Sequence, residues 1–468
     1  MSSDIHDLGA AELAEAYRAH DLSPVDVAEN YLARIEAIDA KINAFCHVDA
    51  GYVRGAAEES ERRWMEGTPR SPLDGVPVAI KDLLLTRGWP TRRGSLTVDA
   101  TGPWLDDAPA VALLRQAGAI LIGKTTTPEF GWKGTTDSPL AGVTRNPWDT
   151  RKTPGGSSGG SGAALAARLT PLALGTDGGG SIRIPASFCG VYGLKPSFGR
   201  VPAWPLSPFG TLAHVGPMSR TVRDSAMLLN AIARPDARDW HAMAYEQTDY
   251  TTGLGNGVEG KRIAFSPRLG HVTRIAPEIE AAVADAARMF ESMGAIVELV
   301  DPPGGDQALV FRTLWWAGAA YLLRDLPGEK WKLLDTGLGQ IAESGAAISL
   351  RDYLEATAAR GAYGSAMRQF MEDYEFVLTP SVATVAFDTG KLTPLDEDGS
   401  AWVSWTPYSF PFNLTQQPAA SVLCGFTRDG LPIGLQIVGR MFDDAGVLAA
   451  SAAYEATNAL YRRSPAVC

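Results

Sequence analysis

Residues 153–176 read TPGGSSGGSGAALAARLTPLALGT, in which a glycine- and serine-rich segment precedes small apolar residues and a strand-like run. Glycine loses more backbone entropy on folding than any other residue, so an ordered loop of this composition needs a physical reason. One interpretation is a flexible linker between domains. The other is a loop whose backbone approaches a reacting group and whose serine takes part in the chemistry.

The residues that follow this loop favour the second interpretation. Residues 162–169 predict a buried helix of small side chains, and residues 172–176 predict a strand. A loop that enters a helix offers unpaired backbone N–H groups to an anion or a developing oxyanion. The loop is therefore predicted to lie inside a folded domain.

The same order of elements recurs along the whole chain. Between helical patterns such as 108–118 and 276–294, short apolar runs are bounded by glycine or proline. These runs are residues 75–80, 119–123, 172–176, 262–265, 295–300, 376–379, 420–426 and 433–439. Strands that alternate with helices over this length predict an α/β fold with a largely parallel sheet.

Composition narrows the class of protein. The chain has 468 residues, 45% of them hydrophobic, which is enough for a sizeable core. Its net charge of −11 and the lack of any basic block indicate no nucleic-acid partner. No secretory h-region and no apolar run long enough to span a membrane are readable. Four widely spaced cysteines fit neither a disulfide framework nor a zinc site, so we expect a cytoplasmic protein with free thiols.

Three short motif matches do not carry a function by themselves. GAILIGKT at 118–125 has the spacing of a phosphate-binding loop, but its central residues predict a strand, and VAIK at 78–81 lacks the other kinase motifs. GGSSG at 155–159 fits the nucleophile elbow of the α/β-hydrolases, which requires an acid and then a histidine downstream. The histidines after it are His214, His241 and His271. A Ser-His-Asp mechanism is disfavoured at this point, although it stays open.

A lysine is the alternative base for a serine. Lys81 ends the apolar run VPVAI, and burial would lower its pKa so that it could accept a proton. A strand-end lysine that reaches solvent or pairs with Asp82 is the simpler interpretation when Lys81 is considered alone. A second segment changes the balance, because Gly178–Gly180 precede Ser181 within LALGTDGGGSIRIPASFCG at 172–190. Successive glycine amides can form an anion-binding nest that would hold the oxyanion produced when Ser181 attacks a carbonyl.

Taken together, these segments resemble the amidase signature family. The matching stretches are GVPVAIKD at 75–82, GAILIGKTTTPEF at 118–130, RNPWDTRKTPGGSSGGSGAALAA at 145–167, LGTDGGGSIRIPASFCGVYGLKPSFGRVP at 174–202 and DGLPIGLQIVGR at 429–440. The resemblance implies one amidase domain over 1–468, with a large, mixed, mostly parallel twisted sheet flanked by helices on both faces. Within it we expect an N-terminal helical segment (1–70), a signature core (71–202), and a region with the substrate pocket and C-terminal strands (203–468).

The resemblance also assigns roles to residues that match the family motif. It implies Lys81 as the base, Ser157 as a bridging serine on a cis peptide bond, and Ser181 as the nucleophile. The implied oxyanion hole is the backbone of Gly178, Gly179, Gly180 and Ser181. The implied supporting residues are Asp177 and Arg183. The implied reaction is hydrolysis of a neutral C–N bond through an acyl-enzyme, without metal or organic cofactor.

The substrate is less defined by the sequence. We predict that the pocket is lined by Gly131, Trp316, Trp405 and Phe410, which would suit an apolar or aromatic amide, anilide or carbamate, with ester cleavage as a side activity. The expected partner is this small molecule, and the expected state is a monomer or homodimer. The amidotransferase subunits of the A type that act on glutamyl-tRNA share the signature, but they need an acid shortly before Asn413-Leu414, where this chain has Trp405-Thr406-Pro407-Tyr408. A catalytically silent binding subunit is the remaining alternative, which the intact serines and lysine disfavour.

Overall fold

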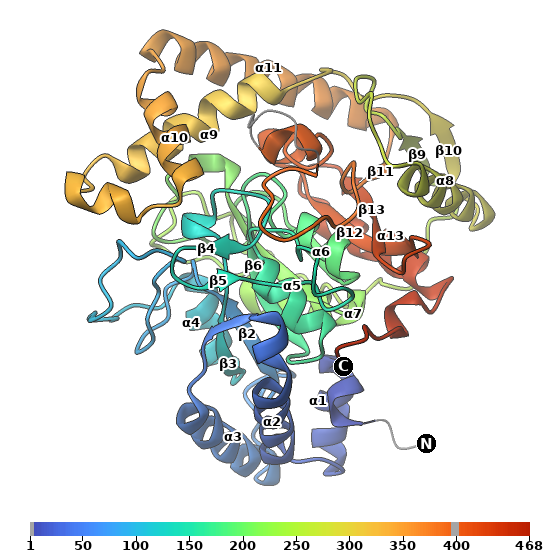
Figure 1. The fold of residues 1–468 in the computed structure, drawn as a ribbon. Coiled ribbons are helices and arrows are strands. Elements are labelled where there is room, and N and C mark those ends of the chain that lie inside the picture. Colours follow the sequence, from blue (N-terminus) through green and yellow to red (C-terminus); the bar gives the residue numbers. More distant parts are fainter. Residues whose placement is uncertain (1–3, 395–401) are drawn as a thin grey trace.

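A computed structural model describes residues 4–394 and 402–468, and its centre is a large mixed sheet (Figure 1). In the described residues this sheet has eleven strands in the order β1-β3-β2-β6-β8-β7-β12-β13-β11-β9-β10. Its strands are β1 (Phe45–His47), β2 (Pro77–Lys81), β3 (Ile120–Thr125), β6 (Leu172–Asp177), β7 (Tyr192–Lys195), β8 (His214–Ser219), β9 (Arg262–Phe265), β10 (Ile296–Leu299), β11 (Phe376–Pro380), β12 (Ala419–Phe426) and β13 (Pro432–Gly439). A separate small ribbon pairs β4 (Asp137–Ser138) with β5 (Gly142–Val143).

Parallel pairing is confined to two blocks of this sheet. Strands β3, β2 and β6 are parallel to one another, and so are β11, β9 and β10. The strands between the two blocks, β8, β7, β12 and β13, pair antiparallel with each neighbour. The large mixed sheet is confirmed, while the parallel pairs make up four of its ten neighbouring pairs within the described residues. Short links such as the β12–β13 hairpin impose antiparallel pairing, because parallel strands need a long crossover connection.

Helices cover both faces of the sheet, as predicted. Successive strand residues point to opposite faces, and β7 shows what each face meets. Tyr192 donates a hydrogen bond to Ser451 of α13, whereas a Cβ on Gly193 would meet Ala186 of α6 at 2.8 Å. The helices are α1 (Ala10–Ala19), α2 (Pro24–Ile42), α3 (Ala50–Met65), α4 (Pro109–Gln116), α5 (Gly159–Ala166), α6 (Arg183–Cys189), α7 (Val222–Ile232), α8 (Pro277–Ser292), α9 (Ala308–Leu323), α10 (Thr336–Ala346), α11 (Leu350–Asp373), α12 (Pro411–Leu414) and α13 (Asp444–Ala456).

The loop and helix at 153–167 are fully ordered parts of this core. Every residue of α5 is buried, and the helix packs against β2 and β6. Small side chains allow this close packing of helix and sheet. The flexible-linker interpretation is therefore wrong, because the glycine- and serine-rich segment connects buried elements.

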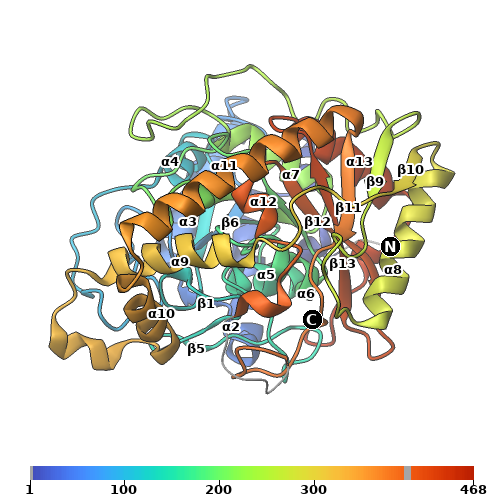
Figure 2. The same ribbon diagram turned by 90° about the horizontal axis from the view of Figure 1, so that it is seen from above.

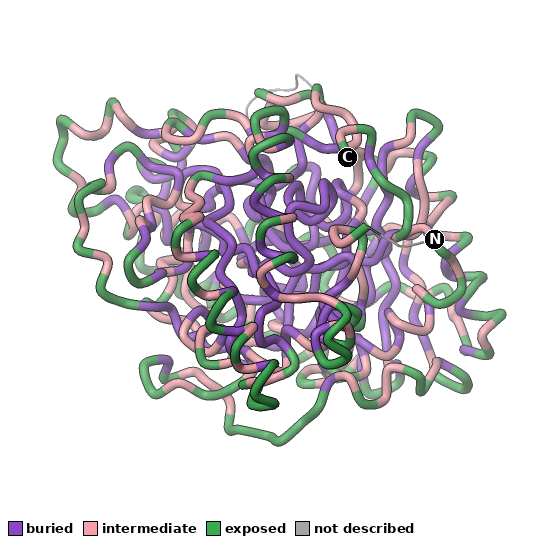
Figure 3. Tube along the Cα trace, turned by 90° about the horizontal axis from the view of Figure 1, so that it is seen from below, coloured by how far each residue is buried: buried purple, intermediate pink, exposed green. Residues whose placement is uncertain are grey.

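A separate layer of helices lies above the carboxyl ends of β2 and β6. In Figure 2, α9 and α11 run alongside each other across the top of the molecule, and α10 packs against α9. Phe311 and Trp315 of α9 belong to a second apolar core together with Trp402 and Met367. Figure 3 shows that the buried parts of the chain are concentrated in the middle of the molecule. Among the described residues, no helix is both long and apolar enough to cross a membrane.

Candidate active site

Lys81 is the last residue of β2, and its side chain is buried at the carboxyl end of the strand. Its Nζ lies 2.7 Å from Oγ of Ser157, 2.9 Å from Oγ of Ser158 and 2.8 Å from Oγ1 of Thr176. Burial lowers the pKa of Lys81 well below its usual value, and the Asp177 carboxylate opposes this shift only in part. A lysine that releases its proton in this way has a lone pair with which it can accept another.

The loop before α5 brings Ser157 to this lysine. The peptide bond between Gly156 and Ser157 is cis, as the resemblance implies. A Cβ on Gly156 would lie 2.5 Å from the carbonyl oxygen of Thr135, so only glycine allows the two backbones to approach this closely. The Ser158 amide donates to the Ser181 carbonyl oxygen at 3.0 Å, which joins this loop to the second glycine-rich loop.

The second loop is fixed by a buried ion pair. Arg183 donates to both carboxylate oxygens of Asp177, with its Nη2 2.9 Å from Oδ1 and its Nε 3.0 Å from Oδ2. Burial alone would raise the pKa of Asp177, but the adjacent Arg183 outweighs it and holds this pKa below its usual range. The expected supporting pair is therefore present in the structure as a bidentate contact, the geometry that suits a guanidinium and a carboxylate.

Residues far along the chain complete this support, and their role was not predicted. Asn413 donates to Asp177 Oδ1 at 2.8 Å and accepts from Arg183 at 2.7 Å. Gln436 accepts from Arg183 at 2.7 Å, and the Ser409 hydroxyl donates to the Gly179 carbonyl at 2.7 Å. Gln436 lies in the matched segment 429–440, so the match itself was the available signal.

The backbone amide of Gly180, which was predicted to belong to the oxyanion hole, already donates a hydrogen bond within the protein. The Gly180 amide donates to Asp177 Oδ1 at 2.8 Å, and this bond directs it toward the ion pair. Gly180 has φ +122°, a backbone conformation that L residues rarely adopt. For the amides of Gly178, Gly179 and Ser181, the described residues supply no hydrogen-bond acceptor. These three amides are the donors that remain for an anion at the loop.

A cavity of about 160 Å³ opens beside both serines. Its wall is mostly apolar and aromatic. It is lined by Leu83, Leu84, Arg93, Ala108, Ala110, Phe130, Gly131, Ser157, Thr176, Gly178, Ser181, Pro202, Ala203, Trp204, Pro205, Leu206, Ser207, Pro208, Phe209, Ala213, His214, Val215, Trp315 and Leu322. The two predicted reactive serines thus share one apolar chamber, which suits a substrate with apolar groups.

Three of the four predicted pocket residues lie elsewhere. Gly131 lines the cavity, but Trp316, Trp405 and Phe410 do not. Consecutive residues of a helix point about 100° apart, so Trp315 of α9 faces the cavity and its neighbour Trp316 packs beneath Arg312. The Trp405 ring stacks on Phe188, with ring centres 5.7 Å apart.

Phe410 has a similar place in the second apolar core. Its ring stacks on Phe311 with 4.9 Å between ring centres, and only 1% of the residue is exposed. The aromatic segments at 311–321 and 402–412 therefore mostly form core. Of their aromatic side chains, the one that lines this cavity is Trp315.

The histidines do not take the place of Lys81. His214 lines the cavity, but its Nδ1 lies 2.8 Å from the Leu212 carbonyl and its Nε2 lies 3.5 Å from Lys195 Nζ. Burial and the nearby Lys195 charge lower the pKa of His214 well below its usual value. In the part of the chain that the structure describes, no hydrogen bond joins a histidine to Ser157 or Ser181.

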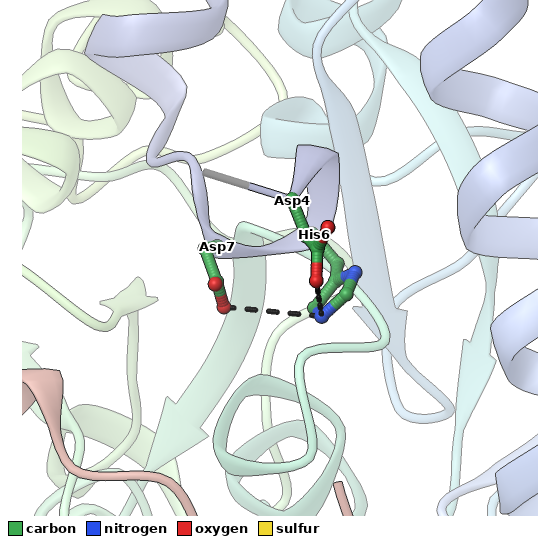
Figure 4. A group of neighbouring side chains, drawn as sticks. All are labelled: Asp4, His6 and Asp7. Carbon is green, nitrogen blue, oxygen red and sulfur yellow. Dashed lines mark ion pairs between the residues drawn. The ribbon is translucent and has the colours of Figure 1, made fainter. Parts of the chain in front are cut away.

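One group of three metal-type ligands occurs among residues 4–394 and 402–468: Asp4, His6 and Asp7 near the N-terminus (Figure 4). The His6 Nε2 lies 4.0 Å from Asp4 and 3.9 Å from Asp7. Arg168 forms an ion pair with Asp7, and burial and Arg34 lower the pKa of His6. The trio is formed by residues outside the cavity lining, and one of its two carboxylates, that of Asp7, already has an arginine partner.

A buried lysine, paired serines and a glycine-rich loop beside an apolar chamber form the kind of site that hydrolases use for acyl transfer through a serine. The chain belongs to the amidase signature family, since the family model Amidase matches residues 26–448. It is accordingly an amidase, an enzyme that hydrolyses amide bonds.

Named relatives agree with this assignment over nearly the whole chain. An acylamidase from Rhodococcus erythropolis is 37% identical, over 99% of this chain and 98% of that protein. The A-type subunit of the glutamyl-tRNA(Gln) amidotransferase of Myxococcus xanthus is also 37% identical, over 98% of this chain and 99% of that protein. The crystal structure of a bacterial aryl acylamidase of the amidase signature family superposes with a TM-score of 0.91 at 32% identity, covering 98% of both chains.

Proposed function

We propose that this amidase cleaves amides, anilides or carbamates with an apolar or aromatic group through an acyl-enzyme on Ser181. The observation that carries the proposal is the 2.7 Å contact between Lys81 Nζ and Ser157 Oγ, at a cavity that Ser157 and Ser181 both line. Neutral Lys81 takes a proton from Ser157 while Ser157 takes one from Ser181. The Ser181 oxygen then bonds to the substrate carbonyl carbon.

The remaining steps return every proton. The oxyanion accepts hydrogen bonds from the free amides of the 178–181 loop. When the C–N bond breaks, the Lys81 proton passes through Ser157 to the leaving nitrogen, and Ser181 keeps the acyl group as an ester. Water then attacks this ester and loses its proton to Lys81 along the same relay. That proton returns to the Ser181 oxygen as its bond to the acyl carbon breaks, which releases free Ser181 and a carboxylic acid, or a carbonic acid half ester when the substrate is a carbamate.

The cavity wall supports the proposed substrate class. Trp315, Phe209 and Leu83 provide apolar contact area close to the serines. The described lining contains no aspartate or glutamate, so it offers no acid for a substrate ammonium group. The aryl acylamidase with the similar structure is named for aryl substrates, which carry the aromatic group that such a wall suits.

Transfer of ammonia from glutamine is the second candidate, because the Myxococcus xanthus amidotransferase protein is as similar to this chain as the acylamidase is. The lack of an acid in the described cavity lining weighs against glutamine, whose amino group is cationic. Turnover of glutamine with glutamyl-tRNA, in preference to aryl amides, would favour this candidate. A silent binding subunit has no support, since the chain is an amidase.

The test is covalent labelling by a fluorophosphonate, followed by mass spectrometry of the labelled peptide. Ser181 is expected to carry the label, and Ser181→Ala should lose both labelling and turnover of an aryl amide while keeping its circular dichroism spectrum. Ser158→Ala provides the comparison of a neighbouring serine, and it should still be labelled at position 181. A label on Ser157, or full activity in Ser181→Ala, would refute the proposal.

A further inference from the structure

Arg93 is the only charged side chain among the described residues that line the catalytic cavity. Its guanidinium forms no ion pair and no hydrogen bond with the described protein. The other lining residues are apolar, aromatic, small or neutral polar. An unpaired cation in such a wall needs an explanation, because buried or partly buried charges are generally paired.

Asp82 is the acid whose charge acts on Arg93, and it is already occupied. The Asp82 carboxylate lies beside the backbone of Arg93 and Gly94, and it pairs with Lys124 at 3.2 Å. Lys124 in turn donates to the Thr91 hydroxyl at 2.7 Å, so the same network fixes both ends of the loop that carries Arg93. Asp82 is therefore paired with Lys124 and leaves the Arg93 side chain without a partner.

The backbone at Arg93 adopts a conformation that is uncommon for its residue type. Arg93 has φ +55° and Phe130 has φ +51°, and the Phe130 amide donates to the Arg93 carbonyl at 2.8 Å. Both residues line the cavity. Left-handed backbone at bulky residues is kept only where the surroundings impose it, and such positions cluster at ligand sites.

The chemistry of the guanidinium indicates what would pair with it. Burial lowers the pKa of Arg93, and Asp82 only partly offsets this effect, which marks an ion that lacks sufficient counter-charge. Arginine stays charged in proteins, and its planar fork matches a carboxylate through two parallel hydrogen bonds. A carboxylate on the substrate would supply the missing charge inside the chamber.

We propose that Arg93 forms an anion subsite of the catalytic cavity, so that the preferred substrates are apolar or aromatic amides that also carry a carboxylate. The inference rests on the proposed function, because it concerns the same cavity and the same reaction. Arg93 is a specificity-determining residue in this scheme. It binds the substrate away from the scissile bond and takes no part in proton transfer.

The experiment compares two pairs of anilides, and in each pair one member carries a carboxylate and the other is neutral. Glutaryl-4-nitroanilide is paired with pentanoyl-4-nitroanilide, which places the charge on the acyl side, and 4-acetamidobenzoate is paired with acetanilide, which places it on the amine side. In the wild type, kcat/KM for the charged member should exceed that of the neutral member by about tenfold or more in one pair. Arg93→Asn should lower that ratio about 10- to 100-fold, since asparagine tolerates positive φ but lacks the charge.

Two further variants control this measurement. Arg93→Lys retains the charge without the fork, so it should keep part of the preference. Arg92→Gln removes the adjacent guanidinium, which donates to the Val98 carbonyl and does not line the cavity, and it should keep the wild-type ratio. An unchanged ratio in Arg93→Asn, or a wild type that favours neither charged anilide, would overturn the anion subsite.

Binding separates this inference from the proposed function. Calorimetry with the Ser181→Ala variant measures the affinity for 4-acetamidobenzoate and acetanilide without turnover. Preference for the carboxylate should disappear in the Arg93→Asn/Ser181→Ala double variant. Efficient hydrolysis of the neutral anilides with no such preference would reject the subsite alone. Carboxylate binding in an enzyme that cleaves none of the four anilides would reject the proposed function alone.

Discussion

Lys81 and Ser157 are separated by 76 positions in the chain, and yet Lys81 Nζ lies 2.7 Å from Ser157 Oγ. Because β2 and β6 are parallel, their carboxyl ends lie side by side. Lys81 at the end of β2 is therefore close to the point where β6 ends and the loop at 178–181 begins. Ser157 arrives at the same edge because α5 starts there and packs under both strands. The contact is thus set by the sheet and by one helix.

The pH dependence of catalysis is the first prediction. Because burial lowers the pKa of Lys81, kcat/KM should rise with pH as the free enzyme loses this proton. Lys81→Met should remove the rising limb and lower kcat/KM by about 100- to 10,000-fold, the range for loss of a general base. Stopped-time assays of an aryl amide across the pH range give both results.

Two other buried groups provide controls for the rising limb of the pH profile of kcat/KM. Lys195 is also fully buried, and burial lowers its pKa, but its Nζ contacts the Pro196 and Gln417 carbonyls and has no described contact with Ser157 or Ser181. His214 titrates below its usual pKa. The rising limb should persist in Lys195→Met and in His214→Asn. If it disappears in His214→Asn and persists in Lys81→Met, a histidine-dependent mechanism replaces the lysine relay.

The pH dependence of the unfolding free energy should also reflect the ionisation of Lys81. Between the lowered pKa of folded Lys81 and its ordinary value of 10.5, the unfolded chain binds more protons than the folded chain. The free energy of unfolding should therefore rise with pH across this window, and Lys81→Met should flatten that slope. Urea unfolding at a series of pH values measures the slope, and an unchanged slope in Lys81→Met would assign it to another group.

The buried ion pair gives a prediction about stability. Arg183→Met leaves the Asp177 carboxylate buried without its counter-charge, which should cost about 3–5 kcal/mol of unfolding free energy. The double variant Asp177→Asn/Arg183→Met removes both charges, and it should lose less than the sum of the two single variants. Additive losses in denaturant unfolding would show that the two residues act independently.

Neighbouring tryptophans of α9 test the cavity wall. Trp315→Leu should lower kcat/KM for an aryl amide by about tenfold or more, since loss of apolar contact in a pocket is worth about 1–3 kcal/mol. Trp316→Leu changes the next residue, which does not line the cavity, and it should stay within about twofold of wild type. Rates are normalised to the fraction of protein that a fluorophosphonate labels. The opposite order of effects would restore the original prediction for Trp316.

A pair of glycine variants tests how closely the cavity wall must approach Ser157. A Cβ on Gly131 would lie 3.2 Å from Ser157 Oγ and 2.7 Å from Leu83 Cδ1, so Gly131→Ala should reduce kcat about 10- to 100-fold by displacing Ser157. Gly142 has φ +72°, almost the same as the +73° of Gly131, and nothing lies within 4 Å of its Cβ position. Gly142→Ala carries the same backbone strain without the contact, and equal kcat losses in the two variants would point to strain alone.

Every predicted apolar run forms a strand, but the sheet was not fully predictable. The strands of the large sheet without a predicted run are β1, β7 and β8. β8 contains Gly216 and Pro217, and β7 contains Gly193 and Lys195, so neither has the continuous apolar run that indicates a buried strand. Both strands pair antiparallel, which is why the alternation pattern predicted a more parallel sheet than the molecule contains.

Motif spacing was more informative about the reactive residues than about the wall around them. Lys81 and Ser157 contact each other as expected. Lys81 ends a strand and Ser157 lies just before a helix that packs on that strand, so the fold fixes the positions of both. The sequence did not indicate which face of α9 points to the cavity, because this helix is apolar on most of its surface. It therefore could not be predicted that Trp315, and not Trp316, lines the cavity. Ser409 and Asn413 contact the loop at 177–181 although they lie beyond residue 400. No hydrophobic periodicity around them indicated that they would bind this loop.

The strand order of the sheet has a consequence for synthesis on the ribosome. Strands β12 and β13 lie between the N-terminal strands and the block β11-β9-β10. The block is synthesised before β12 and β13, but none of its strands pairs with a strand from the N-terminal part of the chain. Residues 262–380 must therefore wait for the hairpin at 419–439 before they can enter the common sheet. The same late segment carries Gln436, so a nascent chain acquires the last contact of the Asp177–Arg183 loop only when its translation is almost finished.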